Sequence, residues 1–325
     1  MPFSGKCLAI SGGVGGAKLA LGLSRILAPE QLTVIANTGD DFIHLGLAIS
    51  PDLDTVMYTL ADVDNKEVGW GQSGESWNFL EALERLGGET WFRLGDRDLA
   101  THIFRTQKYL GGSSLSEITR ELCLTLGVRQ KLAPMTDDKV STVVNTRDGK
   151  TLSFQHYFVR DHCEPVVAGF EFTGIGNASM SEEFSRAITD PALEIVVICP
   201  SNPFVSVAPV LRLPGVQDSI MERNVPVVAV SPIIAGQAIK GPAAKMMREL
   251  GKPQTASAVA EYYVSEFRGL LTGFVIDSQD ENQTGAIRAL GLETIVTNTL
   301  MLTLQDRIDL ADQVLAFTGP RGGTQ

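Results

Sequence analysis

Six short runs of the sequence are almost wholly apolar and do not alternate with polar residues. Such runs are typical of parallel β-strands that helices cover on both faces of a sheet. The segments between them are long enough for helical crossovers, which predicts an α/β protein with a Rossmann-like, doubly wound and mostly parallel sheet. The runs span residues 7–11, 32–37, 194–200, 225–232, 273–277 and 293–298, and helices are expected over residues 17–27, 257–267 and 304–317.

The middle of the chain has a different pattern. Three segments with helical character each end at a glycine, which is a common C-terminal cap. Two β-type runs then flank Arg147-Asp148-Gly149, a strong signal for a hairpin turn. We predict that residues 65–175 form an inserted subdomain of helices and a β-hairpin, and that residues 1–64 and 176–325 form a discontinuous nucleotide-binding core. The helical segments cover residues 75–87, 98–111 and 114–127.

The chain of 325 residues carries a formal net charge of −11. Nucleic-acid binding requires a basic surface, so this charge argues against a DNA or RNA partner. No apolar run approaches the ~18 residues that a membrane span needs, and the N-terminus leads into a strand without a signal-peptide pattern. The four cysteines show no zinc-binding spacing. We therefore expect a cytoplasmic protein that acts on small molecules.

The first apolar run is followed by a loop that contains Gly12, Gly13, Gly15 and Gly16. Such a loop at a helix start offers backbone N–H groups and a partial positive charge to a diphosphate. It lacks the Gly-Lys-Ser/Thr ending of a P-loop, and Lys18 stands where a dinucleotide-binding loop has its third glycine. Lys18 lies on the first helical turn, where it either adds a positive charge to the site or faces solvent.

Three further loops rich in Gly, Pro, Ser and Asn follow other predicted strands. Each of them alone is compatible with an ordinary tight turn between a strand and a helix. Because ligands bind beyond the carboxyl ends of parallel strands, four such loops at one sheet edge predict a binding site there. The three loops span residues 37–41, 200–206 and 231–245.

Four carboxylates, those of Asp40, Asp41, Asp52 and Asp54, fall within fifteen residues after the second strand. Beside a phosphate-binding loop they would repel an anionic ligand unless a cation lies between, and Mg²⁺ held by one or two carboxylates fills that role. The alternative is a structural role in turns and helix caps. Asp52 and Asp54 share a side if their segment is extended, so periodicity alone does not separate them.

Residues 94–106 carry several charged side chains at a predicted helix start. In the simpler interpretation Asp96 caps the helix and the other charges face solvent. In the alternative, Arg97, His102 or Arg105 reaches from the insert to an anionic substrate. A lone histidine such as His102 is more often structural than catalytic. The chain shows no Ser-His-Asp order and no histidine cluster for a metal, which leaves little support for a hydrolase.

Together these motifs resemble those of the 2-phospho-L-lactate transferase family, which acts in coenzyme F420 biosynthesis. The resemblance runs from about residue 7 to 300 and includes SGGVGGAKLALGL, NTGDD, SPDLDTVMYTL, GWG, LGDRDLATH, SNPFVS and AVSPIIAGQAIKGPAAKMM. It implies a Mg²⁺-dependent homodimeric enzyme that transfers a phospho-acid from a guanosine-diphosphate-linked donor to the ribityl hydroxyl of the deazaflavin Fo and releases GMP. The implied acid is 2-phospholactyl, phosphoenolpyruvyl or 3-phosphoglyceryl.

The resemblance also assigns candidate site residues. Asp40 and Asp54 match the family's acidic positions, and the resemblance implies that they bind Mg²⁺ and act in catalysis. One departure is His44-Leu45-Gly46, where the family has adjacent His and Gly, and this lowers the weight of His44 as a site residue. The donor is expected to contact Gly12, Gly13, Gly15, Gly16, Lys18, Asn37, Ser201, Asn202 and Ser231, and Fo is expected near Trp70, His102 and Arg105.

Two other functions fit parts of the sequence. A nucleotide-sugar-binding regulator of the same superfamily would share the glycine loop and the NTGDD turn without catalysing a transfer. The GWG turn and the LGDRDLATH segment favour the transferase over this regulator. A nicotinamide dehydrogenase is the poorer alternative, because the third glycine and the acidic ribose partner are out of place.

Overall fold

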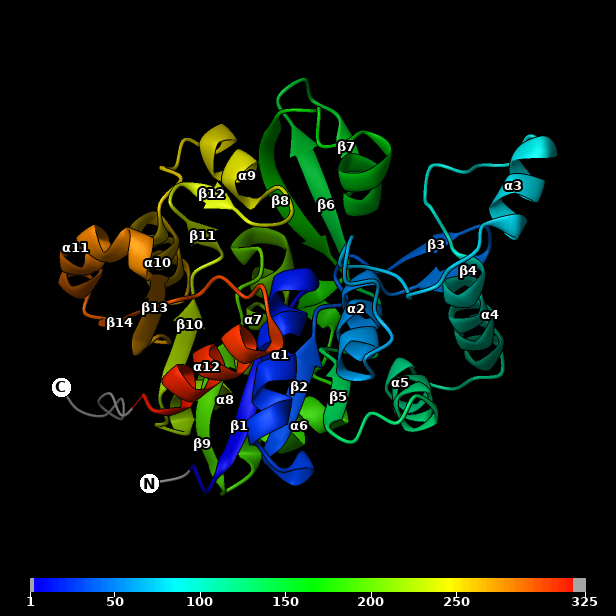
Figure 1. Ribbon diagram of the computed structural model, residues 1–325. Helices are drawn as coiled ribbons and strands as arrows, with labels where there is room; N and C mark the ends of the chain where they lie inside the picture. The colour runs from blue at the N-terminus through cyan, green and yellow to red at the C-terminus, as the bar shows by residue number, and fades with distance from the viewer. Residues whose placement is uncertain (1–2, 318–325) are drawn as a thin grey trace.

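The computed structural model describes residues 3–317. Within them, seven parallel strands form a central sheet in the order β14-β13-β10-β9-β1-β2-β5 (Figure 1). All six strands that the apolar runs predict are present, which confirms the parallel α/β fold. The strands are β1 (Lys6–Ser11), β2 (Leu32–Ala36), β5 (Lys131–Pro134), β9 (Leu193–Ile198), β10 (Val227–Val230), β13 (Gly273–Asp277) and β14 (Glu293–Thr297).

β5 is the strand of this sheet that the apolar runs do not predict. It begins with Lys131 and ends with Pro134, and both residues are tolerated because β5 lies at the sheet edge. Its parallel pairing with β2 places it in the core sheet. The predicted insert of residues 65–175 therefore contains a strand of the core, with a helical part before β5 and a β-rich part after it.

The strand order reverses beside β1. The chain adds β2 and β5 on one side of β1 and then crosses to β9 on the other side. This reversal makes the carboxyl ends of β1 and β9 the topological switch point of the sheet, where open α/β sheets bind their ligands.

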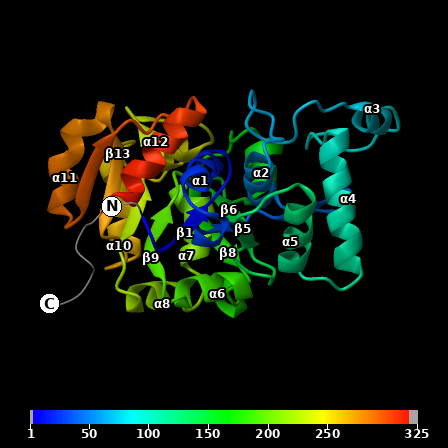
Figure 2. The same cartoon turned by 60° about the horizontal axis from the view of Figure 1, so that its bottom comes forward.

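Helices cover both faces of the sheet, as the strand pattern requires. Along β1, Cys7 and Ala9 point into one apolar core, whereas Leu8 and Ile10 point into the other. Figure 2 shows α1, α2 and α12 over the first face and α6 and α8 over the second. These layers contain α1 (Val14–Ile26), α2 (Pro51–Leu60), α12 (Leu304–Leu315), α6 (Glu182–Thr189), α7 (Ala208–Leu211), α8 (Val216–Glu222) and α10 (Ala256–Glu266).

The middle of the chain adds helices and a small sheet to this core. The three predicted helices are present as α3 (Asn78–Arg85), α4 (Asp96–Leu110) and α5 (Leu115–Thr125), and they lie to one side of the sheet (Figure 1). The predicted hairpin joins β6 (Ser141–Thr146) to β7 (Thr151–Ser153) through Gly149, whose φ is 81°, and β8 (Val167–Thr173) pairs antiparallel with β6. No helix within residues 3–317 is long and apolar enough to cross a membrane.

A short hairpin follows the loop after β2. It joins β3 (Phe42–His44) to β4 (Leu47–Ile49) through Leu45 and Gly46, whose φ angles of 52° and 77° suit a two-residue hairpin turn. The extra leucine of the His44-Leu45-Gly46 segment is therefore a turn residue. The remaining elements are α9 (Ala243–Glu249), α11 (Thr284–Ala289), β11 (Ile233–Ile234), β12 (Gln237–Ala238), η1 (Pro29–Gln31), η2 (His156–Arg160), η3 (Ile175–Asn177), η4 (Pro203–Val207) and η5 (Ser278–Gln283).

The contact between α1 and α12 gives a test of the packing. A Cβ atom at Gly22 of α1 would overlap the carbonyl oxygen of Arg307 in α12. For Gly22→Ala we expect a loss of about 1–3 kcal/mol in the free energy of unfolding, because this overlap outweighs a helix-propensity gain of up to about 1 kcal/mol. Urea denaturation measures it.

The matched control is Gly285→Ala in α11, because no atom lies within 4 Å of the added Cβ. This control should leave stability unchanged or raise it slightly. A Gly22→Ala variant as stable as the wild type would contradict the close packing of α1 on α12.

Candidate functional site

The glycine loop packs tightly against the loop that follows β9. The backbone N–H of Gly12 donates to the hydroxyl of Ser201 over 2.9 Å. A Cβ atom at Gly15 would overlap the carbonyl oxygen of Pro200, and one at Gly16 would lie 2.6 Å from Ser201 Oγ. Glycine is therefore required at these positions because two backbone segments meet at the switch point.

Helix α1 begins directly behind this loop. Its N-cap residue is Gly13, which provides no side chain to cap the first-turn N–H groups. The first N–H groups of a helix lack partners within the helix, and together with the helix dipole they attract anions. The loop and the start of α1 thus form a site suited to a diphosphate.

Asn37, the residue after β2, organises the acidic side of the site. Its side-chain Nδ2 donates to Asp40 Oδ1 over 3.1 Å and to Asp52 Oδ2 over 2.9 Å. Its Oδ1 accepts a hydrogen bond from the backbone N–H of Gly39 over 2.9 Å. Asn37 is fully buried. The structure gives Asn37 the role of holding two carboxylates together, and the donor contact that the resemblance implies stays a prediction.

Asp40 and Asp52 form a buried pair of carboxylates, called the Asp40–Asp52 pair below. Burial raises the pKa of Asp40 well above its usual range, and the neighbouring Asp52 carboxylate raises it further. Burial also raises the pKa of Asp52 to about 6, although a hydrogen bond from Asn37 opposes the shift. A Cβ atom at Gly13 would lie 2.7 Å from Asp52 Oδ1, so this carboxylate faces the glycine loop.

Asp54 lies in a different environment from Asp52. Residues 51–60 form helix α2, so Asp52 and Asp54 are about 200° apart around the helix axis. Arg105 Nη1 donates to Asp54 Oδ2 over 3.0 Å, and Arg105 Nη2 donates to Asp54 Oδ1. The segment is thus helical and not extended, so the two carboxylates do not share a side. Asp54 already has a cation as its partner.

His102 and Arg105, two of the residues expected near Fo, are buried in this ion-pair network. Each is only 1% exposed. His102 Nδ1 lies 3.7 Å from Asp54 Oδ2 and His102 Nε2 lies 3.3 Å from Asp98 Oδ2. Although burial opposes the shift, the contact with His102 lowers the pKa of Asp98. The network fixes α4 on α2, and the contact with Fo that the resemblance implies for these two side chains stays a prediction.

Trp70, the third residue expected near Fo, lies beside the glycine loop and is 43% exposed. A Cβ atom at the adjacent Gly69 would lie 2.9 Å from Val14 Cγ1 in the first turn of α1. The backbone carbonyl of Val68 lies 3.5 Å from Lys240 Nζ in the loop of residues 231–245. This segment therefore lies against the start of α1 and the loop of residues 231–245.

Lys18 is half-buried and does not simply face solvent. Its Nζ donates to the carbonyl of Met301 over 3.2 Å. Burial lowers the pKa of Lys18, and the nearby cations Arg307 and Lys240 lower it further. Arg307 and Lys240 therefore lie near enough to act on the charge of Lys18, and the three positive side chains favour an anionic ligand.

Asn202 and Ser231, which were also predicted to contact the nucleotide donor, have structural roles in turns. Asn202 caps η4, with its Oδ1 accepting from the N–H of Phe204 over 3.0 Å. Ser231 is buried, and its Oγ accepts from the N–H of Ile233 over 3.1 Å. Of the serines and asparagine predicted here, Ser201 is the one that contacts the glycine loop.

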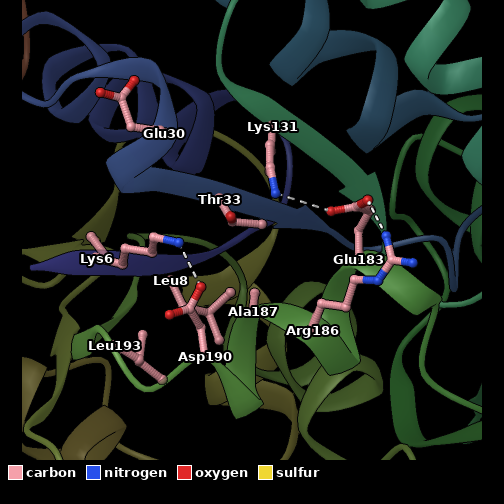
Figure 3. A pocket seen from close by; sticks show the side chains of 11 residues that line it. Lys6, Leu8, Glu30, Thr33, Lys131, Glu183, Arg186, Ala187, Asp190 and Leu193 are labelled. Carbon is pink, nitrogen blue, oxygen red and sulfur yellow. Dashed lines mark hydrogen bonds and ion pairs between the residues drawn. The ribbon is translucent and has the colours of Figure 1, made fainter.

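A surface pocket at the opposite end of the sheet does not belong to this site (Figure 3). It is lined by the starts of β1, β2, β5 and β9 together with α6. Most of its charged side chains pair with one another, as in Lys6–Asp190 at 2.6 Å and Lys131–Glu183 at 3.5 Å. A pocket with compensated charges, at the amino ends of the strands, lacks the features of a phosphate site.

Removing Arg105 tests the assignment of Asp54 to the ion-pair network. Arg105→Met leaves Asp54 buried without its main cation, and we expect a loss of about 3–5 kcal/mol in the free energy of unfolding. The double variant Asp54→Leu/Arg105→Met removes both charges and should recover most of that loss. Glu182→Ala, which breaks the exposed pair with Arg186, should cost less than about 1 kcal/mol in the same urea titration. A double variant no more stable than Arg105→Met would contradict the assignment.

Comparison with known proteins places the chain in a family. The family model of 2-phospho-L-lactate transferase CofD matches residues 7–299. A phosphoenolpyruvate transferase of Streptomyces coelicolor is 38% identical over 96% of this chain and 98% of its own length. A 2-phospho-L-lactate transferase of Methanosarcina acetivorans is 38% identical over 95% of this chain and 97% of its own.

The fold also matches solved structures. A crystal structure of a UPF0052 family member from Bacillus halodurans has a TM-score of 0.66 at 15% identity, and the match covers 96% of this chain and 99% of that chain. At this identity the likeness shows the shared fold. The match to the family model and the identity to the curated relatives show more: the chain belongs to the 2-phospho-L-lactate transferase family, a family of transferases.

Proposed function

We propose that the protein transfers a phospho-acid from a guanosine-diphosphate-linked donor to the ribityl hydroxyl of the deazaflavin Fo, with release of GMP, in coenzyme F420 biosynthesis. The observation that carries this proposal is the Asp40–Asp52 pair, which faces a glycine loop and an uncapped helix start at the switch point. Relatives over nearly the whole length are named 2-phospho-L-lactate transferase and phosphoenolpyruvate transferase.

The donor diphosphate fits between the glycine loop and the nearby cations. The first-turn N–H groups of α1 bind its oxygens, and Lys18, Lys240 and Arg307 offset its charge. We assign Ser201, which already contacts the loop through Gly12, to the nucleoside end of the donor.

The Asp40–Asp52 pair fits Mg²⁺ better than the Asp40 and Asp54 pair that the resemblance implies. Two buried carboxylates that share one amide donor repel each other unless a proton or a cation lies between them. Residues 3–317 contain no group of three or more His, Cys, Asp or Glu side chains that could hold a metal. Mg²⁺ commonly takes one or two carboxylates and completes its shell with phosphate oxygens and waters. When bound, it would offset charge on the diphosphate.

The chain's own groups mainly position and neutralise the reactants. Phosphoryl transfer places little covalent demand on protein side chains, because the transition state is loose and in line. Asn37 fixes the direction of both carboxylates, and the glycine loop orients the diphosphate for attack by the acceptor hydroxyl. A loose transition state needs no strong base, so no residue is given that role.

Formation of GMP tests the proposed function. The purified protein with Fo, donor and Mg²⁺ should release GMP in proportion to the phosphorylated deazaflavin formed. Parallel reactions with lactyl, enolpyruvyl and glyceryl donors identify the acid. Binding of a nucleotide sugar without GMP release would instead support the regulator. The implied homodimer stays a prediction that sedimentation velocity checks.

Substitution of the acidic residues separates their roles. We expect Asp40→Asn and Asp52→Asn each to lower kcat by at least about 100-fold at saturating Mg²⁺, because the charge that faces the diphosphate is lost. Near-normal kcat of Asp52→Asn would contradict the metal assignment, and it would leave Asp54 as the ligand to test.

The raised pKa of Asp52 predicts the pH dependence of the metal-free protein. A carboxyl whose pKa is higher in the folded than in the unfolded state lowers stability as pH rises through its folded pKa, here about 6. Without metal, Asp52→Asn should therefore be more stable than wild type at pH 8, by about 1–3 kcal/mol, and the difference should vanish toward pH 4.

Urea titrations in EDTA measure this difference. Saturating Mg²⁺ should reverse the order, because a ligand that binds only the folded wild type raises its stability. Lower stability of Asp52→Asn than wild type at pH 8 in EDTA would show that the pair carries no electrostatic cost.

A further inference from the structure

Asp40 has a second amide partner, which comes from a distant part of the chain. Gln155 Nε2 donates to Asp40 Oδ2 over 3.3 Å and lies 3.5 Å from the backbone carbonyl oxygen of Asp40. Asn37 donates to the other carboxylate oxygen, Asp40 Oδ1. Both oxygens of this carboxylate therefore have a side-chain amide as a hydrogen-bond donor, and one of the two amides is 115 residues away in the sequence.

Gln155 is held firmly in its place. Its side chain is 4% exposed, and it stands directly before η2. The nearby side chains of Phe154 and Tyr157 are 7% and 0% exposed and belong to an apolar core of the central sheet. An amide fixed between buried aromatic neighbours has few other conformations, so its contact with Asp40 costs little further conformational entropy.

The three-stranded sheet of β6, β7 and β8 contacts the Asp40 loop at a second point. The backbone N–H of Thr142 in β6 donates to the carbonyl of Gly39 over 2.5 Å. A Cβ atom at Gly39 would lie 2.9 Å from Thr142 Oγ1, so the two segments pack closely. Gln155 follows β7 of the same sheet. Gly39 and Asp40 are thus supported by one structural unit, through a backbone contact and a side-chain contact.

The chemical nature of these partners separates Asp40 from Asp54. Arg105, the partner of Asp54, is a cation and compensates its charge. Gln155 and Asn37 are neutral, so they fix the direction of the Asp40 carboxylate and leave its negative charge available to a cation. A carboxylate oxygen has two lone pairs and can accept a hydrogen bond while it binds a metal. Carboxylates that bind metals are commonly held in this way by neighbouring hydrogen bonds.

We propose that Gln155 is a positioning residue, which holds Asp40 Oδ2 in the direction that the cation of the Asp40–Asp52 pair requires. This inference rests on the proposed function and adds to it a role for the sheet of β6, β7 and β8. Asn37 sets the separation of the two carboxylates, whereas Gln155 fixes one of them through its other oxygen. Gln155 acts through Asp40 and needs no contact with donor or acceptor.

Binding of Mn²⁺ to the whole protein with GDP, and without Fo, tests this role in the absence of turnover. Electron paramagnetic resonance of free Mn²⁺ gives Kd for wild type and for two variants of Gln155. Gln155→Met keeps the length of the side chain and removes the donor, and Gln155→Asn keeps the amide and shortens its reach. We expect each variant to raise the Mn²⁺ Kd about tenfold or more. In turnover with Fo and donor, each should also lower kcat, while the KM for Fo stays within about twofold of wild type.

Asn145→Leu is the matched control. It removes the hydrogen bond from Asn145 Nδ2 to Glu171 Oε1, which measures 2.7 Å and links β6 to β8. The same sheet thus loses an amide–carboxylate contact that does not touch Asp40, and the Mn²⁺ Kd should stay within about twofold of wild type. Thermal stability and metal-free GDP affinity are measured for every variant.

The outcomes separate the role of Gln155 from the function on which it rests. A Mn²⁺ Kd that is unchanged in both Gln155 variants would overturn the positioning role. Parallel losses of Mn²⁺ affinity, metal-free GDP affinity and stability would also overturn it, because they would show a purely structural role. A wild type that binds GDP but no Mn²⁺ would instead overturn the proposed metal site, and with it the function as proposed.

Discussion

The site depends on one hydrogen-bonding residue, Asn37, whose amide joins two buried carboxylates beside a helix start. Asp40 and Asp52 lie together in a buried environment. Burial raises the pKa of both carboxyls and favours a cation between them. The glycine loop and the uncapped start of α1 next to them favour an anion. The proposed metal-bound diphosphate would supply both the cation and the anion.

Asp54, two residues after Asp52 in α2, has different partners. Asp54 pairs with Arg105 and His102 of α4, so its charge is compensated by the protein. Because residues 51–60 are helical, the two side chains point in different directions. Asp52 faces the glycine loop, whereas Asp54 pairs with Arg105 of α4. Asp54 thus helps to hold α4 on α2, whereas the proposed role in catalysis belongs to Asp52, two residues earlier.

Much of the fold was predictable from the sequence, because non-alternating apolar runs report parallel strands directly. β5 was not, since an edge strand with Lys131 and Pro134 needs no apolar run. The glycine loop was also predictable, from local composition. The partner of Asp40 was not, because it depends on whether residues 51–55 are helical. Pro51 and the acidic first turn are the signals that favour a helix start there. The burial of Arg105 and the hydrogen bond from Gln155 to Asp40 depend on contacts between distant segments, which no local pattern reports.

We propose that the Asp40–Asp52 pair holds Mg²⁺ against a diphosphate on the glycine loop. A crystal structure with GDP and Mn²⁺, located by its anomalous scattering, tests this most directly. We expect a metal between Asp40 and Asp52 that also contacts the diphosphate, with Asp54 still paired to Arg105. A metal bound to Asp54 with Arg105 displaced, or a diphosphate bound away from residues 12–16, would contradict it.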